Sequence, residues 1–352
     1  MRRVSKDGDV GNVTHYRVPS AVAEEGGAVS QRHAAYHGDK ALAELLAQER
    51  VGRDVASVRA LVAGVIAAPV AEDQSAWLEL VAAKPGTALK TQLLALEAEM
   101  RAESLAAAAR APAHAERLAL LRAELARCGL AGFIVPRGDE HQGEYVPPRA
   151  ERLAWLTGFT GSAGAAVILA EKAAMFVDGR YTLQARAQVA GELYEFHHLI
   201  EEPPADWIVQ QLGAGRALGY DPWLHTALDR ERYATAAAKA GGRLMACEQN
   251  PVDAIWAGQP PAPIAPVVPH PLAYAGRDSR DKCQVLAGGL AAQAIDAVVL
   301  TAPDSIAWLL NIRGGDVPHT PLPLSFALLS ADATVELFCD PRKLAPGLAR
   351  HL

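Results

Sequence analysis

Residues 152–189 read RLAWLTGFTGSAGAAVILAEKAAMFVDGRYTLQARAQV, and this stretch decides the fold of the chain. It contains two apolar runs, at 165–169 and 173–177, which a polar Glu-Lys pair separates. Short apolar runs on either side of a polar turn predict two neighbouring buried strands joined by a tight hairpin. The second run stops just before Gly179, where glycine permits a turn that a residue with a Cβ atom resists. A helix is predicted to follow at 182–189.

The same pattern returns later in the chain in the same order. The matched pairs are AWL at 154–156 and 307–309, AAVIL at 165–169 and SFALL at 325–329, AAMFV at 173–177 and VELFC at 335–339, and DGR at 178–180 and DPR at 340–342. Ordered matches at one long offset predict a duplicated α/β unit. The second copy stops before the equivalents of the first copy's last two helices. It is therefore expected to be incomplete, with exposed strand edges that favour self-association.

Composition sets limits on the function. With 352 residues, half of them hydrophobic, the chain can form two or three domains with ordinary cores. The formal net charge of −6 gives no electrostatic case for binding nucleic acid or an anionic membrane. No apolar run is long enough to span a membrane, and the N-terminal residues lack the apolar core of a signal peptide. Four scattered cysteines favour reduced, buried thiols over disulfides or a metal site. A cytoplasmic protein is predicted.

The first third of the chain has a different character. Residues 1–30 are polar and glycine-rich, which predicts a disordered or loosely attached leader. Residues 31–110 place apolar side chains at i, i+3 and i+4 spacing, which predicts three or four amphipathic helices of no recognised family. His33 and His37 stand one helical turn apart in this segment. They form a candidate metal pair, but a third ligand is lacking, so an exposed or capping role is favoured.

An α/β pattern begins near residue 115. It predicts a first domain at 115–256, a proline-rich linker at 257–278 and a second, truncated domain at 279–352. A polar loop at 139–145 follows the first predicted strand at its carboxyl end, where open α/β sheets often bind ligands. Its carboxylates and His141 are candidates for acid/base chemistry, although a loop held by hydrogen bonds is the favoured interpretation. The glycines of the 152–189 stretch are interpreted as turn formers, because a strand and not a helix follows them.

Several motifs, taken in order, resemble the first two domains of the aminopeptidases P, the Xaa-Pro aminopeptidases of the pita-bread metallopeptidase class. These motifs are FIVP at 133–136, DEHQGEY at 139–145, LTGFTGSAG at 156–164, DGRY at 178–181, NPVDAIW at 250–256 and DSIAWLLNIRGGDV at 304–317. The resemblance covers about residues 115–352, two thirds of the chain. It implies two creatinase-like α/β domains, the second of them incomplete, preceded by an α-helical segment.

The resemblance also implies where the chemistry of the family is carried out. In that family the two creatinase-like domains precede a C-terminal domain in which two Asp, one His and two Glu bind a pair of metal ions, usually manganese. These metals activate a water that attacks the peptide bond before proline. No position here matches those ligand motifs, so no catalytic, cofactor-binding or metal-binding residue is assigned. The manganese pair and peptide substrates with proline at the second position are expected only of full-length relatives.

Four residues are candidates for substrate access or an interface: Arg180, Tyr181, Arg313 and His319. In the family the N-terminal domains narrow the access to the active site and contribute to contacts in a homo-oligomer. For Arg180 and Arg313 the favoured alternative is a structural role in tying turns together. His319 lies in extra residues that lengthen a loop of the second copy, and both roles stay open for it because function often resides in such insertions.

Three hypotheses about function remain. The chain is the N-terminal, non-catalytic portion of an Xaa-Pro aminopeptidase, inactive alone because the metal-binding domain is missing. Alternatively, it is a non-catalytic interaction or oligomerisation protein built on creatinase-like domains, with the N-terminal helices binding a partner. A fragment or a misjoined reading frame is the third possibility, and the sequence does not separate it from the first.

Overall fold

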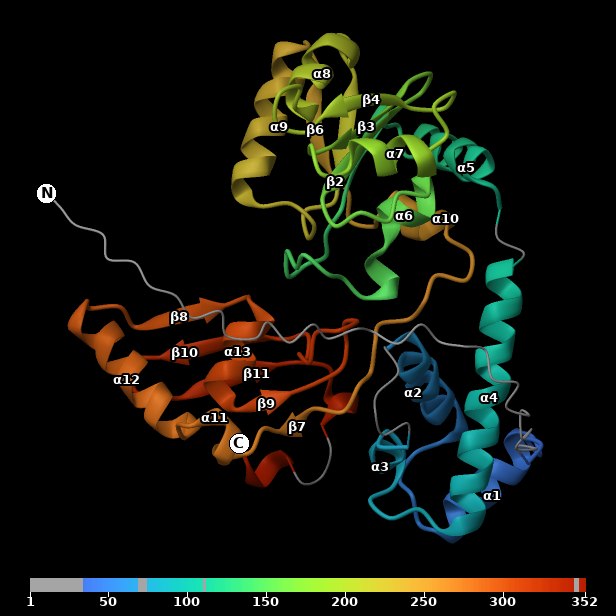
Figure 1. Ribbon diagram of the computed structural model, residues 1–352, viewed down its shortest axis with the longest axis vertical. Coiled ribbons are helices and arrows are strands. Elements are labelled where there is room, and N and C mark those ends of the chain that lie inside the picture. The colour runs from blue at the N-terminus through green and yellow to red at the C-terminus, as the bar shows by residue number, and fades with distance from the viewer. Residues whose placement is uncertain (1–33, 69–74, 110–111, 345–347) are drawn as a thin grey trace, which may run out of the picture. The chain divides into compact units, whose positions relative to one another are not determined.

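The computed structural model describes residues 34–68, 75–109, 112–344 and 348–352. The predicted leader at 1–30 and His33 of the candidate histidine pair lie outside these residues. Figure 1 shows the labelled elements, and each is named below with its bounds. Among the described residues no helix is long and apolar enough to cross a membrane.

The N-terminal segment folds into the predicted amphipathic helices. They are α1 (Asp39–Gln48), α2 (Val55–Ala67), α3 (Leu78–Val81) and α4 (Thr87–Ala109). Their apolar stripes form one shared core, which includes Leu42, Leu61 and Leu93. The first helix begins at Asp39 and not near residue 31, as the sequence suggested, because Gly38 adopts a left-handed φ of 93° just before it. His37 is exposed in the non-helical residues that precede this helix.

The first α/β unit contains one six-stranded sheet in the order β4-β3-β2-β1-β5-β6. Its strands are β1 (Gly132–Pro136), β2 (Gly164–Leu169), β3 (Ala173–Val177), β4 (Glu195–His198), β5 (Ala217–Tyr220) and β6 (Arg243–Ala246). Its helices are α5 (His114–Arg127), α6 (Arg152–Thr157), α7 (Thr182–Gln188), α8 (Pro204–Gln211), α9 (Ala227–Lys239) and α10 (Pro251–Ile255). The predicted hairpin is confirmed, because β2 and β3 pair antiparallel through a short turn.

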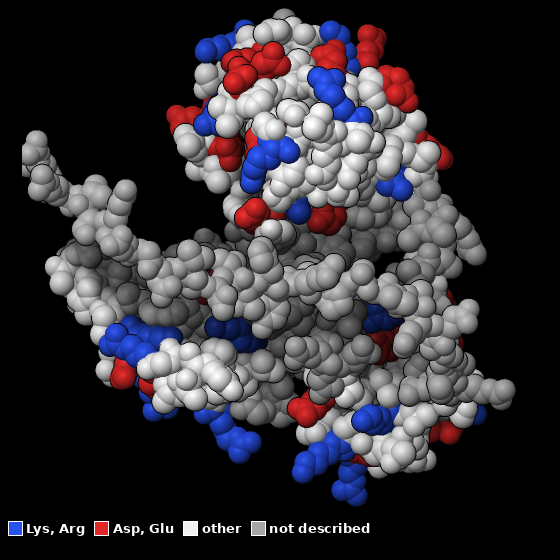
Figure 2. All heavy atoms as spheres, viewed as in Figure 1, with Lys and Arg blue, Asp and Glu red and all other residues white. Residues whose placement is uncertain are grey.

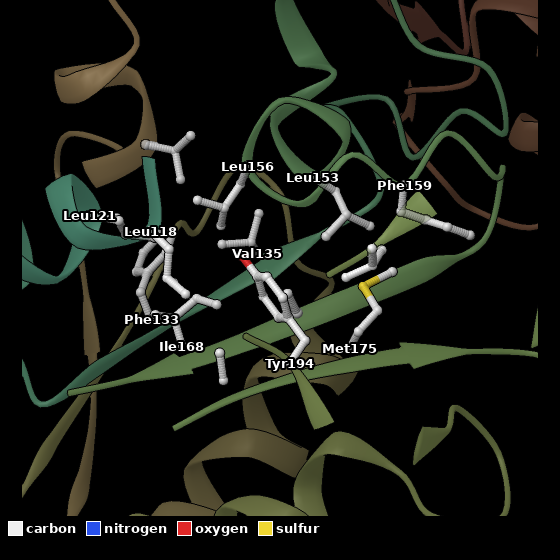
Figure 3. Packing of buried hydrophobic residues seen from close by; sticks show 14 of the residues in the cluster. Leu118, Leu121, Phe133, Val135, Leu153, Leu156, Phe159, Ile168, Met175 and Tyr194 are labelled. Carbon is white, nitrogen blue, oxygen red and sulfur yellow. The ribbon is translucent and has the colours of Figure 1, made fainter. Parts of the chain in front are cut away.

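Helices cover both faces of this sheet. Side chains of α5, α6, α7 and α10 form a core on one face with Phe133, Ile168 and Met175 (Figure 3). Side chains of α8 and α9 form a core on the other face with Ile134 and Phe176. Alternate residues of each strand therefore enter different cores, as the period of two in a strand requires. Strands that are buried on both faces explain why the sequence shows continuous apolar runs here and not an alternating pattern.

The second α/β unit repeats the centre of the first. Its three-stranded sheet has the order β11-β10-β8, from β8 (Ala297–Leu300), β10 (Phe326–Ser330) and β11 (Val335–Phe338). The two helices α12 (Ser279–Ala292) and α13 (Pro303–Leu310) take the places of α5 and α6 and cover one face. Both units pair their three common strands antiparallel. The duplication predicted from the sequence is thus confirmed.

Matching the buried faces shifts one part of the sequence alignment. The core on the helical side contains Ala166 and Ile168 in the first unit, and Ala327 and Leu329 in the second. The run at 165–169 therefore corresponds to 326–330, and not to 325–329 as the sequence match suggested. A shift of one residue would place every side chain of the strand on the wrong face. The hairpin turn is one residue longer in the second unit, at 331–334 against 170–172, and this difference concealed the shift.

The linker between the two units is held to the helical segment and to the second unit. The Ile264 N–H donates to the Gly64 carbonyl of α2 over 2.9 Å, and the Ile264 side chain is buried in the helical core. Gly64 leaves the necessary space, because a Cβ there would lie 2.4 Å from Ile264 Cγ1. Further along, β7 (Val268–Pro269) pairs antiparallel with β9 (Ile312–Arg313). The helical segment is therefore in contact with the α/β part through this linker.

Candidate functional site

Arg180 and Tyr181 lie together at the turn that precedes α7. The Arg180 guanidinium donates to Asp178, with 2.7 Å between Nη2 and Oδ2, and the Asp178 carboxylate also accepts from the Arg180 backbone N–H. These hydrogen bonds hold the pKa of Asp178 below its ordinary value. Asp340 and Arg342 form the same pair in the second unit, at 2.5 Å. An ion pair that recurs at the same turn supports the structural role that the sequence favoured for Arg180.

Tyr181 belongs to a small polar cluster on the surface. Its hydroxyl lies 2.9 Å from the Ser162 hydroxyl, which in turn donates to Glu144 over 3.1 Å. The hydrogen bond with Ser162 lowers the pKa of Tyr181. The Arg180 guanidinium lies over the Tyr181 ring, 5.2 Å from its centroid. The cluster joins three loops at one edge of the first unit, and its charged and hydroxyl groups are already bonded to one another.

Arg313 and His319 lie in the second unit. Arg313 ends β9, and its Nη1 donates to the backbone carbonyl of Ile312 over 2.9 Å. His319 is exposed in the following loop and adopts a left-handed φ of 56°, next to a turn in which the Thr320 N–H donates to the Val317 carbonyl. Among the described residues, no hydrogen bond or ion pair connects these two with Arg180 or Tyr181. The contacts of the described residues therefore do not bring the four candidates together into one site.

The same loop contributes Asp316 to a buried ion pair with Lys343, which the sequence did not reveal. Lys343 Nζ lies 2.7 Å from Asp316 Oδ2, and both side chains are almost completely buried. The Asp316 carboxylate also accepts from the backbone N–H groups of Ala265 and Leu324, which lie on the linker and before β10. Burial raises the pKa of Asp316, and Lys343 opposes that rise. The pair joins the linker to two segments of the second unit, and its contacts define a structural role.

The polar loop after β1 is held by its own hydrogen bonds. Asp139 is buried, and its Oδ1 accepts from the backbone N–H groups of His141 and Gly143 over 3.0 and 3.1 Å. Burial raises the pKa of this carboxyl group. His141 stacks on Phe326 of the second unit, with 4.4 Å between the ring centroids. The favoured interpretation of this loop, one held by hydrogen bonds, is confirmed.

A cation contacts a tryptophan at the same place in both units. In the first unit, Arg117 lies 4.9 Å from the Trp155 ring centroid and donates to the Trp155 carbonyl. In the second, Lys282 lies 4.5 Å from the Trp308 ring centroid and donates to the Trp308 carbonyl over 2.8 Å. Burial lowers the pKa of Lys282. The repeat of Trp155 as Trp308 was visible in the sequence, but the cation beneath each ring was missed.

The described residues do not fit the pair of metal ions that the family resemblance implies. Among them, no group of three or more His, Cys, Asp or Glu side chains is placed to hold a metal ion. Each of the four cysteines is a free thiol, and Cys128 is exposed. On the face in view, basic and acidic side chains are interspersed over the first unit (Figure 2). No catalytic step is therefore derived from these residues.

Two family models match this chain, and both describe the creatinase/prolidase N-terminal domain. One matches residues 117–252 and the other residues 258–352. The two matches correspond to the two α/β units, which defines the class of this part of the chain. Residues 117–352 are thus built from creatinase/prolidase N-terminal domains.

Relatives narrow this class further. The chain is 37% identical over 239 residues to a Pyrenophora teres f. teres protein named "Probable Xaa-Pro aminopeptidase P", and 36% identical over 224 residues to "Aminopeptidase P1" of Lotus japonicus. It resembles the crystal structure of X-prolyl aminopeptidase from Caenorhabditis elegans, described as a cytosolic enzyme with a dinuclear active site. That match has a TM-score of 0.64 and 29% identity over 68% of this chain. Over these residues the chain belongs with the N-terminal region of the aminopeptidases P.

The match covers only part of this chain and only part of each relative. It covers 67% and 63% of this chain for the two sequence relatives. The chain spans 36% and 34% of the length of those relatives and 41% of the C. elegans enzyme. The predicted family and fold class are confirmed. The match does not assign the activity of a whole relative to this chain, because most of each relative's length lies outside the match.

Proposed function

We propose that residues 115–352 act as the N-terminal, non-catalytic portion of an Xaa-Pro aminopeptidase. In a complete enzyme of this kind, a metal-dependent domain releases the N-terminal residue that precedes proline, with two manganese ions as cofactors. The present chain then contributes the two creatinase-like domains. A cytoplasmic location and peptide substrates with proline at the second position belong to the same proposal, as does the division into domains at 115–256 and 279–352.

The observation that carries this proposal is the match of both α/β units to creatinase/prolidase N-terminal domains. Identity of 37% over 239 residues to an aminopeptidase P supports the same lineage. The contacts of the described residues agree with a non-catalytic role, because the buried charges at Asp316 and Lys343 bond to each other and to backbone groups. Arg180, Tyr181, Arg313 and His319 are proposed as surface residues toward a substrate entrance or a subunit interface.

The test measures release of the N-terminal residue from an Xaa-Pro peptide by the purified chain with added Mn²⁺, together with metal analysis. We expect no release and no bound metal. Release that a chelator abolishes would contradict the proposal, provided that it persists in a second preparation from a host without its own Xaa-Pro aminopeptidase. A variant that begins after Pro112 would then locate the metal site in the helical segment or in the α/β units.

A non-catalytic interaction protein is the second candidate, with the N-terminal helices as the binding element. One observation bears on it directly. The helices bury their apolar stripes against one another and take in Ile264 from the linker, so their core is already filled from within the chain. A binding role for them would use their outer faces. A partner that binds the chain and loses affinity after exposed substitutions on α1 or α4, but not on α7, would support this candidate.

A further inference from the structure

Three parallel strands of the first unit end at the same edge of its sheet. Because β1, β5 and β6 run parallel to one another, the loops that follow them, at 137–145, 221–226 and 247–250, meet there. The chain leaves β1 toward α6 and leaves β5 toward α9, and these two helices enter the cores on opposite faces of the sheet. Open α/β sheets bind ligands in the crevice between such diverging connections.

A cleft of about 690 Å³ lies at this position. All three loops contribute to its walls, together with the start of α6 and with α10. The side chains on which the argument depends are Glu140 after β1, Arg149 and Arg152 at the start of α6, Trp223 after β5 and Glu248 after β6. Small-molecule sites in proteins have volumes of about 300–1,000 Å³. The cleft is therefore large enough for a small molecule or for the end of a peptide.

Arg152 gives the cleft a buried donor without a partner. Only 8% of this residue is exposed, and its Nε and Nη2 donate to the two carboxylate oxygens of Asp253 over 2.7 and 2.8 Å. Its Nη1 is buried and has no hydrogen-bond partner among the described residues. Folded proteins seldom leave a buried N–H group unpaired. An acceptor oxygen of a bound molecule is the partner that this corner of the cleft lacks.

Carboxylates outnumber guanidinium groups in this cleft. The carboxylates are those of Glu140, Asp221, Glu248 and Asp253, against the guanidinium groups of Arg149 and Arg152. Asp253 is paired with Arg152, and Asp221 accepts from the Asn250 side-chain amide over 2.9 Å. Glu140 and Glu248 are exposed and have no hydrogen bond or ion pair with another described side chain. This excess of negative charge favours a ligand that carries a positive group.

Trp223 adds an apolar surface to the same cleft. It is 70% exposed, although its backbone N–H donates to Asp221 Oδ1 over 2.9 Å and so fixes its place in the loop. The neighbouring Leu224 also lines the cleft and is buried. The face of an exposed tryptophan ring attracts both cations and apolar side chains. A ligand with an apolar side chain next to its positive group would therefore use this ring.

We propose that this cleft binds an α-ammonium group with its neighbouring carbonyl oxygen, as found in a peptide amino terminus or a free amino acid. The ammonium group pairs with the carboxylates of Glu140 and Glu248, and the carbonyl oxygen accepts from Arg152 Nη1. The side chain of the same residue packs on Trp223. Exposed side chains at the mouth, such as Glu140, change rotamer on binding and open Nη1 to the ligand. Because carboxylates are in excess, a peptide amino terminus binds more tightly than a free amino acid, which adds a negative charge.

Calorimetric titration of the full chain with L-phenylalaninamide tests this proposal. The titration is made at about pH 6.5, where an α-amino group with a pKa of about 8 is protonated. Phenylalaninamide should bind, whereas N-acetylphenylalaninamide, which lacks the ammonium, and phenethylamine, which lacks the carbonyl, should each bind about 10-fold more weakly or less. L-Phenylalanine distinguishes the two sources of the ligand. Weaker binding than the amide assigns the cleft to peptide amino termini, and tighter binding assigns it to free amino acids.

Substitutions test the two polar contacts separately. The double variant Glu140→Gln, Glu248→Gln should weaken binding of phenylalaninamide by about 10-fold. Glu201→Gln with Glu231→Gln is the matched control, because it removes the same charge from exposed residues of the first unit outside the cleft. Arg152→Lys keeps a cation beside Asp253 but removes Nη1, so phenylalaninamide and phenethylamine should bind to it alike. If circular dichroism shows that this variant does not fold, the ligand series on the unchanged chain and the glutamate variants decide.

Three outcomes overturn the proposal: phenylalaninamide does not bind, its N-acetyl form binds equally well, or the control double variant weakens binding as much as the cleft variant does. None of them affects the proposed function, which is tested by peptide hydrolysis and metal analysis. Binding at the cleft involves no catalytic step of this chain. Chelator-sensitive hydrolysis by the purified chain would in turn contradict the proposed function and leave the cleft as it stands.

Discussion

In the residues that the structure describes, helices cover both faces of the sheet in the first α/β unit and one face in the second. Their three common strands pair in the same directions, and a cation contacts a tryptophan in each. The difference lies in what surrounds this common centre. Strand pairing and one helical layer are thus enough to define the register of a creatinase-like sheet, while the second layer determines which of its residues are buried. The same substitution at equivalent positions of the two units therefore measures what the second helical layer contributes to stability.

The largest expected difference comes from the same substitution at equivalent positions of β1 and β8. Ile134→Lys places an unpaired ammonium in a closed core, and should lower the free energy of unfolding by about 4 kcal/mol or more. Val299→Lys places it in solvent and should change that free energy by less than about 0.5 kcal/mol. Urea unfolding checks both, with amide exchange reporting on each unit. A large loss for Val299→Lys would mean that the chain itself covers this face.

The buried pair of Asp316 and Lys343 gives the next largest effect. Lys343→Met leaves the Asp316 carboxylate buried without its cation. It should therefore lower the free energy of unfolding by about 3–5 kcal/mol. Arg342→Met is the control, because Arg342 pairs with Asp340 near the surface, where such a pair contributes about 1 kcal/mol or less. Equal losses in the two variants would show that Asp316 takes up its proton or another partner at little cost.

The pH dependence of Lys343→Met follows from the same carboxyl group. Burial raises the pKa of Asp316, and removal of Lys343 takes away a group that opposes this rise. Between the ordinary aspartate pKa of about 3.9 and the raised value, the folded chain binds more protons than the unfolded chain, so stability falls as pH increases. The urea midpoint of Lys343→Met should therefore decline more steeply above about pH 4 than that of the unchanged chain. Parallel curves for the two proteins would refute the assignment.

The sequence predicted the strands and helices of both units because their signals are local. Apolar runs of about five residues, a glycine turn and a polar hairpin loop are each contained in a few neighbouring positions. The register of the second hairpin was predicted one residue wrong, since one extra residue at 331–334 changes the alignment without changing the pattern. The helix start at Asp39 was missed for a similar reason, because a left-handed Gly38 leaves no mark in hydrophobic periodicity.

The sites were harder to predict than the elements. Asp316 and Lys343 stand 27 positions apart, and their pairing depends on how the loop and the C-terminal turn pack together. The cations of the tryptophan sites are an Arg in one unit and a Lys in the other, so only the aligned duplication could have revealed them. The roles of Arg180, Tyr181, Arg313 and His319 in substrate access or at an interface remain predictions.

Substitution of each of the two tryptophans tests how much the additional covering of the first unit contributes to stability. Trp155→Ala removes a buried ring that contacts both Arg117 and Trp256, and should cost about 3–5 kcal/mol. Trp308→Ala removes a half-exposed ring and a cation–π contact, and should cost about 1–2 kcal/mol. The gap of about 2 kcal/mol measures the stacking and burial that α10 provides in the first unit. Chemical denaturation of each variant checks it, and equal losses would mean that stacking by Trp256 contributes little.

The smallest predicted effect concerns the closed core of the first unit and has the opposite sign. Tyr194 is buried among apolar side chains, and its hydroxyl has no hydrogen-bond partner among the described residues (Figure 3). Burial raises the pKa of this phenol. Tyr194→Phe removes an unsatisfied polar atom and keeps the ring, so it should stabilise the first unit by about 1 kcal/mol. Thermal and urea unfolding measure the change.

Tyr233→Phe is the matched control for this substitution, since Tyr233 is a partly buried tyrosine of the opposite core whose ring meets His225 edge-on. Tyr233→Phe should raise the free energy of unfolding by less than Tyr194→Phe does, because the Tyr233 hydroxyl is not among the buried groups without a partner. A loss of stability in Tyr194→Phe would mean that the hydroxyl is satisfied in solution, and that this core includes a polar site. Covering both faces of a sheet would then protect a buried hydrogen bond as well as apolar area, and the contrast with the open second unit would extend to polar groups.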